Sequence, residues 1–157
     1  MKSQSGFTLV EILIVVVILG ILAAIVIPQF TEASTEAKTS SLVTDLQSVR
    51  SQIQLYKIQH LDQIPGTQGQ DFVTAMTSYT LQDGSLAAPQ EPGDGVYGPY
   101  LNQIPKNQFI ADAALQDDVT EAILTPAVAD NSSGWFFNTV TGEFKANDTY
   151  DAGHWGF

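Results

Sequence analysis

The sequence of 157 residues contains no cysteine and only two histidines, His60 and His154. The absence of cysteine excludes disulfide bonds, thiolate metal sites and a cysteine nucleophile. Basic residues are also scarce, 6 against 17 acidic ones, and the formal net charge is −11. Because nucleic-acid binding depends on clustered lysines and arginines that contact phosphates, this balance argues against a nucleic-acid partner. The length suits one modest domain.

One long hydrophobic run is present, with no polar side chain from residue 12 to residue 27. Extended back to Phe7, it covers 21 residues, interrupted only by Thr8 and Glu11. A helix of this length is about 32 Å long, which matches the hydrocarbon thickness of a bilayer. We therefore expect a single membrane-spanning helix over residues 7–27. Lys2 is the sole basic residue before it, so the positive-inside rule places the N-terminus in the cytoplasm and the acidic remainder outside.

A cleavable secretory signal is the main alternative for this segment. Such a signal has a shorter apolar core, and small residues for cleavage follow that core. Here Ala23 and Ala24 lie inside the run, and three more apolar residues follow them. The sequence therefore favours a retained span. In the alternative, the mature chain begins beyond Ile27 as a secreted or membrane-tethered binding domain.

Glu11 is the one charged residue inside the predicted span. A carboxylate there costs a few kcal/mol near the bilayer centre and less near an end. Such a group normally has a partner, and the span offers none. We expect a positive group from another molecule or from a newly created amino terminus, with simple extension of Glu11 towards the interface as the alternative.

The N-terminus resembles the class III signal of type IV prepilins and pseudopilins. The resemblance rests on Gly6-Phe7-Thr8-Leu9-Val10-Glu11, preceded by a short polar leader with one lysine and followed by the apolar run. It implies that residues 1–6 are a leader, that a prepilin peptidase cuts between Gly6 and Phe7, and that Phe7 is then N-methylated. It also implies that Glu11 pairs with the Phe7 amine of a neighbouring subunit and so sets the register of a helical filament.

Two helix-weakening residues, Gly20 and Pro28, lie where members of that family have such residues. Proline removes one helical hydrogen bond, and glycine costs about 1 kcal/mol relative to alanine. The resemblance implies that this stretch kinks or partly unwinds when subunits pack. Tolerated helix breakers in a membrane helix are the alternative.

Residues 28–61 predict an amphipathic stem helix that continues the span, so that the two form one helix of some fifty residues. Residues 29–61 contain neither glycine nor proline. Apolar positions recur at helical spacing and form one stripe, namely Leu42, Leu46, Val49, Ile53 and Tyr56, ending at His60. We expect this stripe to pack on the chain's own domain. His60 is interpreted as a boundary residue, not as a ligand.

Residues 62–157 predict an exported head, and the expected fold is α+β and pilin-like: a long N-terminal helix packed on a small antiparallel sheet. Residues 71–78 are expected to form a short helix, and residues 83–98, rich in glycine and proline, a loop. Residues 134–147 read as a hairpin with a turn at 139–142. Two strands alone are marginal, so a third strand or the stem is needed to cover them.

Parts of the stem and head resemble the G-type major pseudopilin of type II secretion. The resemblance rests on residues 44–57 with Tyr56-Lys57, on His60 before Ile64-Pro65, and on Gly98-Pro99-Tyr100-Leu101 before Ile104-Pro105. It implies a non-enzymatic subunit of a homo-oligomeric pseudopilus in the inner membrane, with a periplasmic or extracellular head, that helps to export folded proteins. The implied partners are an assembly platform, an ATPase and minor pseudopilins. A type IV pilus subunit for adhesion, motility or DNA uptake is the alternative, which the absence of cysteine disfavours.

Six aspartates of the head are of the type that ligates calcium: Asp112, Asp117, Asp118, Asp130, Asp148 and Asp151. Members of the G family have a calcium loop after an Asp-Pro-Trp-Gly phrase, which this chain lacks. We therefore expect solvated acidic loops with no metal and no cofactor, and a structural calcium ion is the alternative. His154 lies in the C-terminal tail and is expected to do no chemistry.

Overall fold

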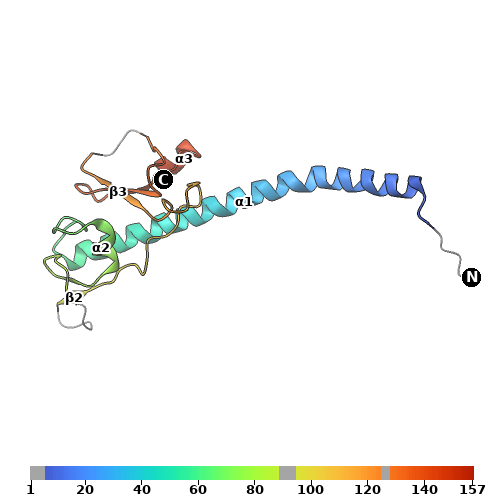
Figure 1. Cartoon of the computed structure of the whole chain (residues 1–157). Helices are drawn as coiled ribbons and strands as arrows, with labels where there is room; N and C mark the ends of the chain where they lie inside the picture. Colours follow the sequence, from blue (N-terminus) through green and yellow to red (C-terminus); the bar gives the residue numbers. More distant parts are fainter. Residues whose placement is uncertain (1–5, 89–94, 125–127) are drawn as a thin grey trace, which may run out of the picture. The chain divides into compact units, whose positions relative to one another are not determined.

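The computed structural model describes residues 6–88, 95–124 and 128–157, and the chain divides into two compact units, Met1–Thr39 and Ser40–Phe157. One helix, α1 (Leu9–Gln59), runs through both units over 51 residues (Figure 1). The predicted continuity of span and stem is confirmed. The helix ends two residues before the predicted limit, and the two positions at that limit, Leu61 and Asp62, adopt positive φ angles of 54° and 66°.

The first unit is built from the apolar part of α1. Every side chain from residue 7 to residue 27 is exposed, with exposed fractions near one half for most of the large apolar ones. By length and composition α1 is able to cross a membrane, and none of its most apolar 18-residue window is buried within the chain. A soluble helix normally buries one apolar face. This surface is therefore made to be covered by lipid or by other molecules.

The second unit is organised around the stem stripe. The five stripe residues, Leu42, Leu46, Val49, Ile53 and Tyr56, are the buried residues of α1. They form one hydrophobic core with residues from several later parts of the head, among them Phe72, Met76, Trp135, Phe137 and Phe144. The helical spacing of 4, 3, 4 and 3 residues turns all five side chains to the same side. Figure 1 shows the later chain folded back along this part of the helix.

A short helix, α2 (Phe72–Thr77), covers part of that core, as predicted for residues 71–78. Asp71 caps its N-terminus, because its carboxylate accepts a hydrogen bond of 2.7 Å from the Thr74 amide. Glu121 of the sheet adds a second acceptor, at 2.8 Å from the Phe72 amide. These two carboxylates satisfy donors that a six-residue helix cannot satisfy by itself.

The predicted hairpin is confirmed as β4 (Trp135–Asn138) and β5 (Phe144–Ala146), which pair antiparallel with Phe137 opposite Phe144. A third strand, β3 (Val119–Ala122), pairs with β4 and gives the sheet order β3-β4-β5. That pairing is parallel, so the sheet is mixed where the sequence predicts a purely antiparallel one. The cause is the connection from β3 to β4, which is long enough to return the chain to the same end of the sheet.

The prediction of a loop over residues 83–98 is wrong at the C-terminal end of that range. The pair Val96–Tyr97 forms β2, which runs antiparallel to β1 (Thr80–Leu81). Glycine and proline dominate the composition of this segment, and a two-residue strand has no periodicity of its own. Residues 89–94 of the predicted loop lie outside the described residues.

Arg50 joins the stem to the sheet. Its Nε and Nη2 atoms both donate to the Phe144 carbonyl oxygen, at 3.0 and 2.8 Å. Hydrogen bonds from charged donors are worth about twice as much as neutral ones. One stem side chain therefore fixes the position of β5 against the helix.

Gly134, just before β4, lies where a larger residue has no room. A Cβ atom there falls on the Gln116 carbonyl group and lies 3.0 Å from the Leu115 oxygen. The Gln116 oxygen is held in place by the Asn107 amide at 2.9 Å, and the Gly134 oxygen is bound by the Asn107 side chain at the same distance. The Cβ atom would clash with backbone atoms that are held by hydrogen bonds, so neither segment can shift to relieve the clash.

We therefore expect Gly134→Ala to lower the free energy of unfolding of the head by about 2–4 kcal/mol. Urea unfolding followed by tryptophan fluorescence measures the change. Gly156→Ala is the matched control, because a Cβ atom there meets nothing within 4 Å. Equal stability of the two variants contradicts the packing described here.

Candidate functional site

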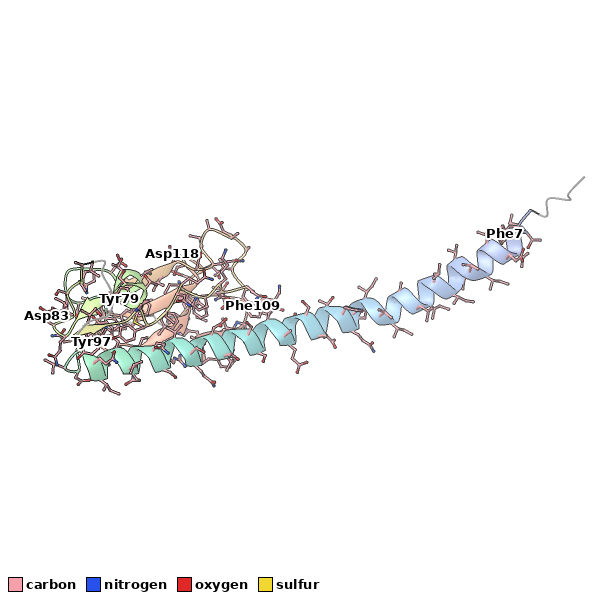
Figure 2. The ribbon with its side chains drawn as sticks, turned by 90° about the horizontal axis from the view of Figure 1, so that it is seen from below. Phe7, Tyr79, Asp83, Tyr97, Phe109 and Asp118 are labelled. Carbon is pink, nitrogen blue, oxygen red and sulfur yellow. The ribbon has the colours of Figure 1, made fainter. Side chains whose placement is uncertain are left out.

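Gly6 and Phe7, the residues of the predicted cleavage, lie ahead of α1 in a non-helical stretch. The Phe7 side chain is 84% exposed, and Figure 2 shows it at the start of the helix. The bond between the two residues therefore lies outside regular secondary structure. A peptidase is able to reach that bond without unwinding the helix.

Glu11 is held by Thr8 at the first turn of α1. Its Oε2 atom accepts hydrogen bonds from the Thr8 amide and the Thr8 hydroxyl, both at 3.0 Å. The Glu11 amide donates in return to the Thr8 hydroxyl oxygen at 3.2 Å. This reciprocal arrangement is a capping box. Thr8 is thus a site residue that the predictions above do not name, although the Thr-x-x-Glu spacing is its sequence signal.

The capping box leaves the charge of Glu11 uncompensated within the described residues, because its two partner groups are neutral donors. Glu11 itself is exposed in the single chain. The pairing of Glu11 with an amine of a neighbouring subunit stays a prediction. The Glu11 side chain is already oriented before any such pairing, because Thr8 holds one of its carboxylate oxygens.

Gly20 and Pro28 both lie inside α1, which continues through them. A Cβ atom added at Gly20 meets nothing within 4 Å. Packing within this chain therefore gives no reason for a glycine at this position. The predicted flexibility of the stretch in a filament is not decided by a single chain and stays a prediction.

His60 is a core residue, which corrects its interpretation as a boundary residue. Its ring is fully buried and stacks on Tyr56 at a centroid distance of 3.9 Å. Nδ1 lies 2.8 Å from the Tyr56 carbonyl oxygen, and Nε2 lies 2.9 Å from the Thr80 hydroxyl. Because a carbonyl only accepts, Nδ1 carries the hydrogen and the Thr80 hydroxyl donates to Nε2. Burial lowers the pKa of the His60 imidazole.

His154 is likewise buried and is not a free tail residue. It lies in the C-terminal helix α3 (Ala152–Gly156), and its Nδ1 atom is 2.7 Å from Oδ1 of Asp148. Asp148 is also buried and accepts a further hydrogen bond, at 2.9 Å, from the Asn107 side chain. The expected C-terminal tail is thus a short helix, whereas the expectation that His154 does no chemistry stays a prediction. His154 joins the last helix to the head through a buried side-chain hydrogen bond with Asp148.

The six candidate calcium ligands are spread over the head. In the described ranges, no group of three or more histidine, aspartate or glutamate side chains comes close enough to hold a metal ion. Asp130 is bound by the Asn147 side chain, and Asp148 by the His154 ring. Asp112, Asp118 and Asp151 each accept from a nearby backbone amide in their own turn.

Residues 1–27 match the protein family described as "Prokaryotic N-terminal methylation motif". The chain is 34% identical over 103 residues to the type II secretion system core protein G of Klebsiella michiganensis, which covers 61% of this chain and 72% of the relative. It is 34% identical over 109 residues to the protein of the same name from Aeromonas hydrophila, which covers 69% of each chain. The chain belongs to the family of the type II secretion system core protein G. It is thus a type IV pilin-like pseudopilin.

Two relatives from Pseudomonas aeruginosa match more locally. The protein from Pseudomonas aeruginosa is 43% identical over 67 residues, but this match spans 43% of the present chain and 46% of the relative. A fimbrial protein of Pseudomonas aeruginosa is 33% identical over 87 residues, or 54% of this chain and 56% of that protein. No solved structure matches the chain. The family assignment therefore rests on sequence relatives, and the fold described above agrees with it.

The burial of His60 predicts how the stability of the head changes with pH. The unfolded chain binds a proton at His60 as the pH falls through the ordinary value of 6.5, whereas the folded chain resists protonation to a lower pH. The unfolded state then holds more protons, so the free energy of unfolding decreases as the pH falls below about 6.5. Urea midpoints between about pH 7.5 and 5.5 measure this dependence.

His60→Gln serves as the reference, because it removes the titrating group and keeps a polar side chain opposite Thr80. The slope of its urea midpoint against pH is expected to be smaller than that of the unchanged chain. Burial raises the pKa of the Glu121 carboxyl, which acts in the opposite direction, but this contribution is common to both proteins. Equal slopes disprove the role given to His60.

Proposed function

We propose that the chain is a structural subunit of a type II secretion pseudopilus that helps to move folded proteins out of the cell. The observation that carries the proposal is the segment of residues 7–27, whose entirely exposed apolar surface contains a single carboxylate, Glu11, four residues after Phe7. Such a surface requires a continuous apolar environment. Membership of the G family and the methylation motif over residues 1–27 support this function.

The first step is processing at the membrane. The subunit is inserted once through the inner membrane by residues 7–27, with its N-terminus in the cytoplasm and its head in the periplasm. A prepilin peptidase removes residues 1–6, and Phe7 is then N-methylated. The exposed, non-helical Gly6–Phe7 bond supports cleavage at this point. Because the span follows the cut, the mature protein stays in the membrane.

Assembly then exchanges lipid for neighbouring subunits around the apolar helix. The new Phe7 amine of one subunit pairs with the Glu11 carboxylate of the next, and each cancels the charge of the other in an apolar surrounding. An unpaired buried charge is strongly penalised, so other registers are disfavoured. Thr8 supports this role because it already orients the Glu11 carboxylate. An inner-membrane platform and an ATPase supply the work, and minor pseudopilins complete the filament.

The head and stem play no enzymatic part in this proposal. The stripe from Leu42 to Tyr56 joins the head to the helix, so that the head travels with the filament as one body. Its buried histidines are bound to Tyr56, Thr80 and Asp148 within the head. These contacts favour a structural role for both rings. Neither nucleic acid nor a catalytic cofactor enters the proposed function.

A type IV pilus subunit, for adhesion, motility or DNA uptake, is the second candidate. The match to the fimbrial protein of Pseudomonas aeruginosa favours it. That match spans 56% of the relative, whereas two G-family proteins are covered to 72% and 69%. The secretion pseudopilus is therefore the function that the observations support best.

The register mechanism is tested with Glu11→Gln in the source bacterium, and Glu36→Gln, an exposed stem carboxylate outside the span, is the control. Loss of the charge pair leaves a buried amine without a partner and is expected to reduce sheared filaments at least about tenfold. Processing at Phe7 is expected to continue in both variants. Immunoblots of membrane and sheared fractions measure both quantities.

Filaments of Glu11→Gln at the level of Glu36→Gln contradict the charge-pair mechanism. The same strains distinguish the two functions. In the pseudopilus, Glu11→Gln abolishes the appearance of exported enzymes in the medium while surface pili persist. In the type IV pilus, the surface pili are lost and export continues.

A further inference from the structure

The side chain of Asn147 contacts most of the loop formed by residues 130–133. Asn147 is buried and follows directly after β5. Its Nδ2 atom is ringed by three oxygen atoms: Asp130 Oδ1 at 2.8 Å, Ser132 Oγ at 3.2 Å and Ser133 Oγ at 3.2 Å. Three loop oxygens thus converge on a single nitrogen.

The other polar groups of Asn147 hold the backbone of the same loop. Its Oδ1 atom accepts from the Asp130 amide at 3.2 Å, and its carbonyl oxygen accepts from the Asn131 amide at 3.0 Å. The Asn147 amide in turn donates to the Gly134 carbonyl at 3.0 Å. Donors and acceptors of one residue are therefore matched to both ends of the loop. Buried polar groups are stable in a fold when they are satisfied in this way.

The Asp130 carboxylate already accepts hydrogen bonds from several donors. Asp130 Oδ1 accepts from the Ser132 amide at 2.9 Å as well as from Asn147. Hydrogen bonds from the Ser132 hydroxyl and amide, together with the Asn147 amide, lower the pKa of the Asp130 carboxyl. Asp130 is therefore ionised at neutral pH, and neutral dipoles of its own loop stabilise its charge.

The second buried aspartate nearby is compensated by a different group. One oxygen of Asp148 is bound by His154 at 2.7 Å, and the other is bound by the Asn107 side chain at 2.9 Å. Asp148 and Asp130 thus have different direct donors, although the Gly134 carbonyl oxygen accepts from both Asn107 and Asn147 and links the two sets of contacts. Neither offers a carboxylate that lacks a donor.

Calcium needs six to eight oxygen ligands, several of them from carboxylates. Around the Asn147 nitrogen the described residues supply one carboxylate and two hydroxyls, and a donor group fills the centre. The residues present therefore do not fit the calcium ion that the resemblance to the G family raises. The donor chemistry decides this, because a nitrogen carrying hydrogens and a cation compete for the same oxygens.

We propose that the side-chain amide group of Asn147 replaces a cation in this head: it binds the loop oxygens that a cation would otherwise bind. The head therefore folds and stays folded without calcium. The amide hydrogens gather the oxygens of Asp130, Ser132 and Ser133, and the loop closes on them. The proposal concerns the folded head and is independent of the filament function. A failure of the filament experiment leaves it untouched.

The first test is thermal unfolding of the full chain in detergent, with and without calcium. Both tryptophans, Trp135 and Trp155, lie in the head, so their fluorescence reports its unfolding. Equal midpoints, within about 1 °C, are expected in EGTA and in millimolar calcium. A rise of about 5 °C or more with calcium overturns the proposal, because it shows that the folded head binds the ion.

The second test is Asn147→Asp, which replaces the central donor by a carboxylate of the same size. Placed against Asp130, this group repels it, and we expect the unfolding midpoint in EGTA to fall by about 5 °C or more. Calcium in the millimolar range is expected to restore at least half of that loss. Asn102→Asp, at an exposed position, is the control for the added charge alone.

Each outcome with Asn147→Asp supports or contradicts one part of the proposal. A variant that is as stable in EGTA as the Asn102→Asp control contradicts the role of the amide hydrogens. A loss that calcium does not repair contradicts the claim that the amide stands in for a cation. If Asn147→Asp does not fold in EGTA, folding on addition of calcium is the supporting result, and failure to fold in calcium is the contradicting one.

Discussion

One constraint governs the molecule: residues 7–27 are apolar except at Thr8 and Glu11, and all of them are exposed. Exposure of such a surface to water is unfavourable, since burial of apolar area is the main driving force of folding and association. Two environments satisfy it, the hydrocarbon of a bilayer and a sheath of identical helices. A subunit that moves from the bilayer into a filament therefore keeps its apolar helix in an apolar environment. The positions that matter most are then the exceptions to the apolar pattern, Thr8 and Glu11 above all.

The second half of the same helix follows the opposite rule. Between Ser40 and Gln59 one stripe is buried, and the head is assembled upon it. Core packing, the double hydrogen bond of Arg50 and the buried ring of His60 attach the head to the stem at separate points. The head is closed by further polar contacts, those of Asn147 and the Asp148–His154 pair. A head built in this way needs neither a disulfide nor the thiolate metal sites that the lack of cysteine excludes.

Elements with a local signal were predictable from the sequence. The uninterrupted run over residues 7–27, the stem stripe, the short helix behind Asp71 and the hairpin of β4 and β5 each have a period or a cap that lies within a few residues. The capping box of Thr8 and Glu11 also has such a signal, but the stronger motif around it drew the prediction to Glu11 alone. Local patterns thus carried most of the fold.

What was missed depends on partners outside the local pattern, most of them far away in the sequence. The parallel pairing of β3 and the two-residue strand β2 are stabilised by strands that the chain reaches only after a loop. His60 is buried by Thr80, and His154 by Asp148 and the aromatic side chains around it. A histidine at the end of a stripe or of a chain reads as exposed unless its partner is known. Polar networks of this kind have no periodicity, so only the folded structure reveals them.

The central claim is that the apolar segment is retained as the start of the mature subunit. The intact mass and N-terminal sequence of the protein isolated from membranes test it most directly. The account predicts a chain that begins at Phe7 and carries one methyl group on its amine. A chain that begins beyond Ile27 contradicts it, because the head is then a secreted domain without the helix on which filament assembly depends.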